Sequence, residues 1–287
     1  MSTLITTDDA LRRYIPNVLA SVKGETSLFD KLTPFLILAE QWVATTFTST
    51  SLFNQLCLAD ESSLLRIYTA KVVVSHAFMQ AVPSLDLVLT PNGFGIVSNA
   101  NIAPASKERV ERLILSLEQE RDAAIQLLLS ALAACPDWHP SVQCGYFSAT
   151  LFPNLDLCDV LGVVEHKWQK YQALRSKVIS IESELASNFI SEAQFDIFRA
   201  EVLSPSSDSV LKKSVIRVLR SEIVRLLQTN TALETPDHLR PSHNLLHIVD
   251  IIKKNPDEFP EWHNSPTAAL FTPTIFENKK DDKAYWF

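Results

Sequence analysis

The segment ILAEQWVATTFTSTSLFNQLCLADESSLLRIYTAKVVV, residues 37–74, matches ISIESELASNFISEAQFDIFRAEVLSPSSDSVLKKSVI, residues 179–216, without a gap. The offset is 142 positions, and nine of the 38 columns are identical, several times the number expected by chance. Fixed-period self-similarity indicates an internal repeat, and two copies are typical of a duplicated domain rather than a solenoid. The identical pairs are Ile37/Ile179, Glu40/Glu182, Ala44/Ala186, Phe47/Phe189, Ser49/Ser191, Phe53/Phe195, Ser62/Ser204, Lys71/Lys213 and Val73/Val215.

A second match lies further along the chain at a different offset. CPDWHPS at residues 135–141 resembles NPD at 255–257 followed by EWHNS at 261–265. Because the duplicated segments carry no catalytic signature, they favour a structural protein over an enzyme.

The composition favours helices. The chain has 287 residues, which is enough for two domains of ordinary size, and 46% of them are apolar. It contains only five glycines, whereas Leu, Ala, Ser and Glu are abundant. Proteins that bind nucleotides or build sheets with tight turns usually contain more glycine. We therefore expect a mainly α protein made of two related helical-bundle domains.

Apolar residues recur at helical spacing along most of the chain. Leu32, Leu36 and Val43 mark the apolar face of a helix expected over 32–47. In the long helix expected over 106–134, the charged residues Glu118, Glu120, Arg121 and Asp122 are expected on the polar side. Further helices are expected over 50–58, 62–81, 159–188, 191–200, 208–228 and 242–254.

Two stretches differ from this helical pattern. In residues 84–104, alternating leucines precede the turn signal Pro91-Asn92-Gly93, which predicts a β-hairpin or a pair of extended arms. Residues 266–287 contain two prolines and the charged run 279–283, so they predict an extended C-terminal arm.

Prolines also set the expected domain borders. Pro136, Pro140 and Pro153 bound a loop-rich junction that we take as the boundary. The expected organisation is an N-terminal segment over 1–26, helical domain 1 over 27–140 with the hairpin 84–104, and helical domain 2 over 141–287 with the C-terminal arm 266–287.

Charge and cysteine content narrow the function classes. The formal net charge of −7 argues against a general nucleic-acid binder, which would carry a basic stripe. The four cysteines form no C-x-x-C pair and no signal peptide precedes them, so we expect reduced thiols in a reducing compartment. No apolar run approaches the roughly 18–20 residues of a membrane span.

The motifs that could indicate chemistry have simpler interpretations. His243, His247 and Asp250 share one helical face, but a zinc protease would need Glu at position 244, which is Asn244. Gly93-Phe94-Gly95 lacks the third glycine of a dinucleotide fingerprint and is better explained as a hairpin tip. We therefore expect no catalytic residue, no metal and no cofactor.

One segment is specific enough to resemble a known family. Residues 87–109, LVLTPNGFGIVSNANIAPASKER, resemble a family of proteins from phages and prophages of Bacteroides and its relatives, as do LITTDDAL at residues 4–11 and FPEW at 259–262. Members of that family look like head–tail connector (adaptor) proteins. The resemblance implies a structural virion protein of a tailed phage, assembled in the host cytoplasm into a homo-oligomeric ring in the neck between portal and tail.

The same resemblance implies the partners. They are identical subunits, the portal protein and tail or other neck proteins, with no membrane, and with DNA only as cargo that passes through the channel. Aromatic and hairpin-tip residues are the expected interface anchors, because aromatics dominate interface energetics. A cytoplasmic helical adaptor or regulatory protein remains the alternative. The expected interface residues are Asn92, Gly93, Phe94, Gly95, Trp262, Tyr285, Trp286 and Phe287.

Overall fold

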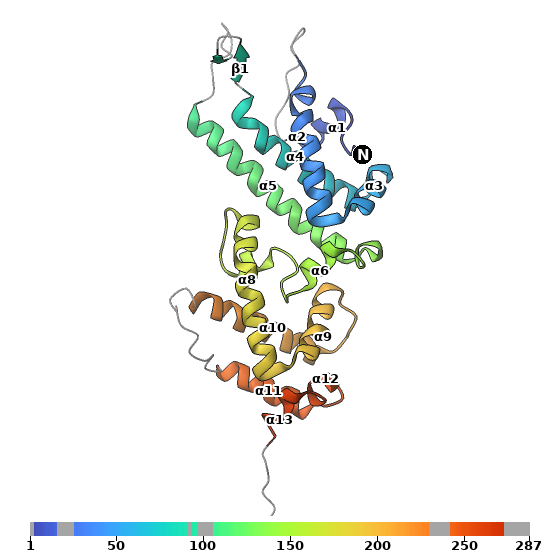
Figure 1. Ribbon diagram of the computed structural model, residues 1–287, viewed down its shortest axis with the longest axis vertical. Helices are drawn as coiled ribbons and strands as arrows, with labels where there is room; N and C mark the ends of the chain where they lie inside the picture. The colour runs from blue at the N-terminus through green and yellow to red at the C-terminus, as the bar shows by residue number, and fades with distance from the viewer. Residues whose placement is uncertain are drawn as a thin grey trace, which may run out of the picture. The chain divides into compact units, whose positions relative to one another are not determined.

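The protein is mainly helical, as expected from its sequence (Figure 1). The structure is a computed structural model that describes residues 3–15, 26–85, 87–90, 93–96, 106–229 and 242–272. The chain divides into two compact units. Unit 1 comprises Met1–Ser176 and Val202–Ser204, and unit 2 comprises Lys177–Glu201 and Pro205–Phe287.

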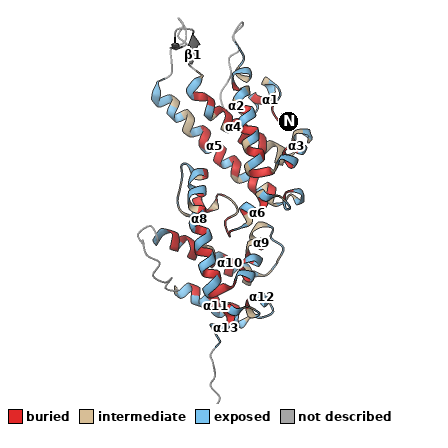
Figure 2. Cartoon of the chain, viewed as in Figure 1, coloured by how far each residue is buried: buried red, intermediate tan, exposed pale blue. Residues whose placement is uncertain are grey.

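Unit 1 is built around three long helices. Helix α4 packs against both α2 and α5, and the facing sides of these helices are buried (Figure 2). Ser27 caps α2 by accepting a hydrogen bond from the Asp30 backbone N–H, and Pro34 lies inside that helix. The elements are α1 (Asp8–Arg12), α2 (Leu28–Val43), the π-helix η1 (Ala44–Thr48), α3 (Thr50–Leu58), α4 (Leu64–Ala81), the 3₁₀ turn η2 (Val82–Ser84), α5 (Lys107–Ala133), the 3₁₀ turn η3 (Pro136–Trp138), α6 (Val142–Ser148) and α7 (Asp156–Val160).

Helix α8 (Lys167–Leu185) carries the chain from unit 1 into unit 2. In unit 2, α10 packs against α11, and α13 packs against the π-helix η4. The amphipathic helix α11 buries Leu245, Ile248 and Ile252 on one face. The further elements are η4 (Ala186–Ile190), α9 (Glu192–Leu203), α10 (Val210–Thr229), α11 (His243–Lys254), α12 (Pro260–His263) and α13 (Pro266–Ala269).

Two short strands lie within the range in which the sequence predicts a hairpin. They are β1 (Leu87–Thr90) and β2 (Gly93–Ile96), and they pair antiparallel with Leu87 opposite Ile96 and Thr90 opposite Gly93.

The predicted domain boundary at 140/141 differs from the observed one, which falls within α8 at Ser176/Lys177. The proline-rich stretch after α5 is not a linker, because Trp138 and Phe147 are buried in unit 1. The N-terminal segment is not separate either. Its residues Leu4 and Leu11 are buried, and the Leu4 backbone N–H donates to Glu40 Oε1 at 2.7 Å.

The start of the predicted C-terminal arm is also wrong. Residues 266–269 form α13, in which Thr267 and Ala268 are buried. Pro266 occupies the first turn of this helix, where its fixed φ suits a helix and its missing N–H costs nothing. A proline that we interpreted as a breaker is therefore a helix start. Residues 273–287 lie outside the described residues.

Candidate functional site

The predicted interface residues fall into three groups. Gly93, Phe94 and Gly95 lie in β2, where they pair with Thr90, Leu89 and Val88. Asn92, Tyr285, Trp286 and Phe287 lie outside the described residues. The remaining residue, Trp262, lies in the core of unit 2.

Trp262 is therefore not available as a surface anchor. Its side chain is 2% exposed, and its indole Nε1–H donates to the Phe189 backbone carbonyl at 2.8 Å. Its ring also lies 6.2 Å from that of Phe271. A buried tryptophan needs a partner for its N–H, and here the partner belongs to the same unit. The prediction that Trp262 binds a partner is wrong for this reason.

Unit 1 contains the same arrangement around Trp138. Its Nε1–H donates to the Phe47 backbone carbonyl at 2.6 Å, and it is 1% exposed. Each tryptophan thus binds the carbonyl of a buried phenylalanine inside a π-helix, Phe47 in η1 and Phe189 in η4. We call these two places the unit 1 corner (η1, Ser49, η3 and the start of α6) and the unit 2 corner (η4, Ser191, α12 and α13).

Each π-helix ends at a serine with unusual backbone angles. Ser49 has φ 80° and ψ 152°, and Ser191 has φ 75° and ψ 146°. This region is costly for any residue with a Cβ atom. Each serine also caps the next helix, because its Oγ accepts a hydrogen bond from the backbone N–H three residues later, at 3.3 Å in both cases. The chain therefore turns sharply at the same point in both units.

The residues after each tryptophan repeat the same contacts. The Nε2 of His139 lies 2.9 Å from the Ala133 carbonyl at the end of α5, and the Nε2 of His263 lies 3.1 Å from the Ile252 carbonyl in α11. Ser141 and Ser265 then cap α6 and α13 through their hydroxyl groups. Finally, Phe147 lies against Phe47, and Phe271 lies against Phe189, with ring centroids 5.9 and 6.2 Å apart.

The two corners differ in the residue that follows the capping serine by two positions. In the unit 1 corner, the side-chain amide of Gln143 donates to the Thr45 backbone carbonyl at 2.9 Å. The corresponding residues of the unit 2 corner are Thr267 and Ser187, which follow Ser265 and precede Phe189 by the same two positions. They line a hollow of about 420 Å³.

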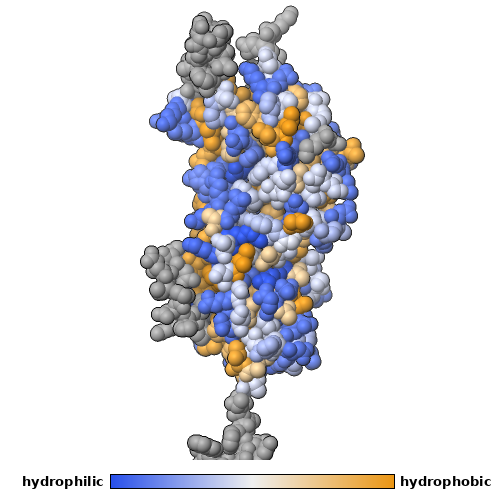
Figure 3. Space-filling view, viewed as in Figure 1, coloured by the Kyte–Doolittle hydropathy of each residue, from blue (hydrophilic) through white to orange (hydrophobic). Residues whose placement is uncertain are grey.

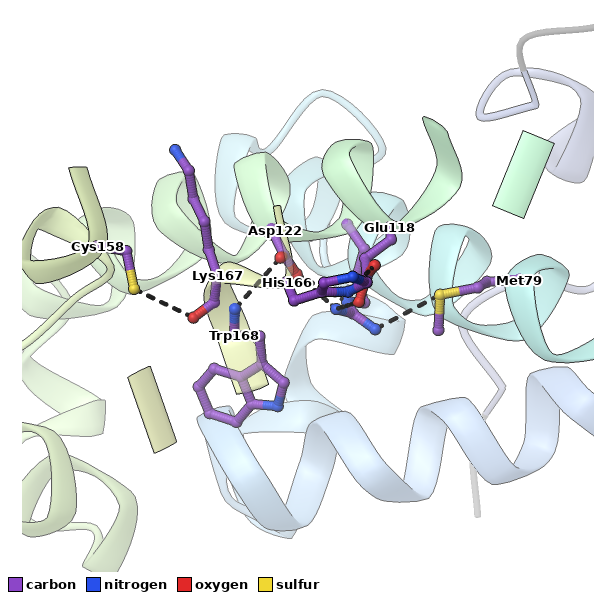
Figure 4. A network of polar contacts seen from close by, with 8 residues as sticks. Met79, Glu118, Asp122, Cys158, His166, Lys167 and Trp168 are labelled. Atoms are coloured by element: carbon purple, nitrogen blue, oxygen red, sulfur yellow. Dashed lines mark hydrogen bonds and ion pairs between the residues drawn. The ribbon is translucent and has the colours of Figure 1, made fainter. Parts of the chain in front are cut away.

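A buried charge cluster lies on α5 in unit 1 (Figure 4). The guanidinium of Arg121 is 3% exposed and donates to Asp122 Oδ1 at 2.7 and 2.9 Å and to Glu118 Oε1 at 3.2 Å. Its third nitrogen points at the sulfur of Met79, 3.6 Å away. The sequence pattern assigned these three charged residues to a polar face, and this is wrong for Glu118, Arg121 and Asp122. Their close spacing on one turn was the available signal for mutual pairing.

The same cluster holds the start of α8, as the close-up in Figure 4 shows. Asp122 Oδ2 accepts a hydrogen bond from the Trp168 backbone N–H at 3.2 Å, and Glu118 Oε2 lies 2.6 Å from His166 Nδ1. The Cys158 thiol donates to the Lys167 carbonyl at 3.2 Å. An N-terminal N–H of a helix needs an acceptor, and here it comes from another helix. Removing Arg121 would leave two buried carboxylates without their cation, a change that typically costs about 3–5 kcal/mol.

Burial shifts the pKa of several groups in unit 1. Burial first, and then the nearby Arg121 charge, lower the pKa of His76 to about 4; its ring stacks on Trp42 at 4.0 Å. Burial raises the pKa of Glu40, against the opposing effect of the backbone N–H groups of Leu4 and Ile5. Burial also raises the pKa of the Cys57 and Cys158 thiols to about 11. Thiols with such values are weak nucleophiles at neutral pH.

The remaining motifs show no clustered chemistry. His243, His247 and Asp250 are exposed on α11, and no three metal-ligating side chains gather in the described part of the chain. All four cysteines are described, and none forms a disulfide. None of the described helices is long and apolar enough to cross a membrane.

The surface in Figure 3 mixes hydrophilic areas with scattered hydrophobic ones. Several large aliphatic side chains on described helices and loops are exposed to solvent. Single exposed aliphatics are ordinary, so they mark no site by themselves. They include Leu38, Leu58, Leu64, Val142, Val164 and Val210.

Part of the chain is similar to a known protein family. Residues 15–148 match a family model described as a family of unknown function (DUF6712). The matched range includes η1, Trp138 and Phe147, so the similarity to this family covers the unit 1 corner. No curated protein and no solved structure matches the chain.

Proposed function

We propose that the chain is a structural subunit of a tailed-phage neck, a head–tail connector that assembles into a ring between portal and tail. The resemblance of residues 87–109 to connector proteins supplies the identity of this role. These residues include both described strands and the first turn of α5. In a ring, one patch of a subunit meets a different patch of the next, and a paired-strand element is a common means of making such a contact.

The observation that carries the proposal is the repeated corner. In each corner, a buried tryptophan donates to a phenylalanine carbonyl, and a strained serine ends the π-helix. These polar groups bind other groups of the same unit and hold its helices in place. Buried polar groups of this kind make a fold rigid and unique when they are satisfied. A rigid helical subunit suits an assembly whose task is geometric.

We further propose that the chain contains two copies of one module, of which the second begins with α8, a helix that starts in unit 1 and ends in unit 2. The elements follow one another in the same order, with α2, η1, α3, α4, α5, η3 and α6 corresponding to α8, η4, α9, α10, α11, α12 and α13. Each π-helix lies 142 positions along the chain from its counterpart. The hydrogen bond from the tryptophan indole to the phenylalanine carbonyl spans 91 residues in unit 1 and 73 in unit 2. The additional residues of unit 1 accommodate the strand pair and the longer α5.

The mass of the purified protein, alone and with its portal, tests the proposal. A connector forms a ring of several copies by itself or on the portal, and native mass spectrometry or cryo-electron microscopy would detect it. A chain that stays a monomer or dimer in both conditions contradicts the ring. That result would favour the alternative, a helical adaptor that binds a different protein.

A further inference from the structure

The two corners are closed differently. The unit 1 corner carries its own closing group, since the Gln143 amide reaches the Thr45 carbonyl at 2.9 Å. At the equivalent place in the unit 2 corner stands Thr267, whose side chain is two bonds shorter and cannot span the same gap to Ser187. The place that Gln143 occupies in the unit 1 corner corresponds to a hollow of about 420 Å³ in the unit 2 corner.

The lining of this hollow defines what it can bind. Hydroxyl groups come from Ser187, Ser191, Ser265 and Thr267, carboxylates from Glu192 and Glu261, and a side-chain amide from Asn264. None of the described residues that line it is Lys, Arg or His, so its field disfavours an anion. The two carboxylates favour a group that donates hydrogen bonds, and the Asn264 amide can donate to an acceptor on the same group. A primary amide brings two N–H donors and one acceptor, which suits carbonyl, hydroxyl and carboxylate partners together.

We propose that the hollow of the unit 2 corner receives a glutamine side chain from a second copy of this chain, in the way that Gln143 fills the unit 1 corner. The proposal rests on the proposed ring. A ring contact joins two different patches, and here the receiving patch is polar and concave, as interface rims commonly are. The chain supplies the matching group, because unit 1 exposes several glutamines on its described helices. They are Gln41, Gln55, Gln80, Gln119, Gln169 and Gln172.

The substitution Thr267→Gln tests the proposal by giving the unit 2 corner its own closing group. The new amide should bond the Ser187 carbonyl within the same chain and exclude the neighbour's side chain. We expect ring assembly to require at least about tenfold higher protein concentration, measured by mass photometry over a dilution series. The matched control Thr267→Ser leaves the hollow open, and we expect it to assemble within about twofold of the unchanged protein.

A second variant separates blocking from misfolding. Thr267→Met fills the hollow without an amide, and circular dichroism and the thermal midpoint establish whether each variant is folded. A folded Thr267→Gln or Thr267→Met chain that assembles as readily as the unchanged protein overturns the inference and leaves the ring intact. An unchanged protein that forms no ring, alone or with portal, overturns the proposed function and this inference with it. Loss of assembly in both filled variants but not in Thr267→Ser supports the inference.

Discussion

At the scale of the residue, the two buried tryptophans are held by their indole N–H groups as well as by apolar packing. Each donates to a phenylalanine carbonyl that is part of a π-helix, Trp138 to Phe47 and Trp262 to Phe189. Burial of an indole is favourable only when its N–H finds a partner. This requirement links Trp138 to a residue 91 positions earlier in the chain, and Trp262 to a residue 73 positions earlier.

We predict that Trp262→Phe lowers the free energy of unfolding of unit 2 by about 1–3 kcal/mol. The ring remains apolar, but the Phe189 carbonyl is left buried without its donor. Urea unfolding, with hydrogen exchange to assign the change to unit 2, measures the loss. Trp138→Phe is the matched change in unit 1. Equal stability of Trp262→Phe and the unchanged protein would show that the hydrogen bond contributes nothing.

His76 makes the stability of unit 1 depend on pH. Its folded pKa of about 4 lies below its ordinary value of 6.5, because burial and Arg121 both disfavour the charged ring. The unfolded state therefore takes up a proton first as the pH falls, and the folded state loses stability between about pH 6.5 and 4. Allowing for the partial exposure of the ring, the loss is about 1–2 kcal/mol.

His76→Phe should keep the stacking on Trp42 and remove this loss. Free energies of unfolding at pH 7 and pH 4.5, from urea titrations, give the comparison. We expect the difference between the two pH values to be smaller in the variant by about 1 kcal/mol or more. The carboxylates titrate in both proteins and therefore cancel in the comparison. Identical pH dependence in both proteins would contradict the assignment to His76.

At the scale of the element, the π-helix and its terminal serine form one unit of structure. Ser49 and Ser191 adopt backbone angles that glycine tolerates easily. A residue with a Cβ atom adopts them only at a cost of about 1–3 kcal/mol. Their hydroxyl caps offset part of this cost. The serine thus combines a strained turn with a helix start.

Substitution separates the two roles. We expect Ser49→Gly and Ser191→Gly to raise the free energy of unfolding by about 1 kcal/mol, because relief of strain exceeds the few tenths lost with the cap. Ser49→Ala and Ser191→Ala keep the strain and lose the cap, so they should lower stability by about 1 kcal/mol. Thermal unfolding of the four variants is the measurement. Glycine variants less stable than the alanine variants would rule out backbone strain at the corners.

The charge cluster on α5 acts on a whole element as well. Asp122 supplies an acceptor to the first turn of α8, and Glu118 holds His166, whose φ of 54° marks the turn into that helix. Because α8 carries the chain from unit 1 into unit 2, the cluster fixes where this helix begins in unit 1.

At the scale of the whole molecule, the proposed assembly depends on elements outside the two cores. Deletion of residues 90–97 removes all of β2 and the last residue of β1, but no residue of the buried helices. We expect the deleted protein to keep its thermal midpoint within about 2 °C and to lose ring formation. Calorimetry and mass photometry test the two parts of the prediction. A large fall in the midpoint would instead make the strand pair part of the core of unit 1.

Local and periodic features of this protein follow from its sequence alone. Helical spacing and caps placed several helices well, because an amphipathic face must be buried wherever it occurs; α3 coincides with the expected helix 50–58. The helix expected over 159–188 is wrong at its start, because residues 161–166 form a turn between α7 and α8 and the helix begins at Lys167. The recurrence of Phe47 at Phe189, and of Trp138 at Trp262, was also visible as a pattern. The hydrogen-bond partners of the two tryptophans were not visible in the sequence. A hydrogen bond across 73 or 91 residues is set by packing and produces no periodic pattern.

Only the tertiary structure decided which polar and aromatic groups lie inside. Arg121 and its carboxylates follow the pattern of a solvated face, yet they are buried because they neutralise one another and cap α8. Trp262 has the character of an interface anchor, yet it is buried because the Phe189 carbonyl satisfies its N–H. Composition determines that such groups exist, whereas the environment that packing creates determines whether they meet water, each other or a partner.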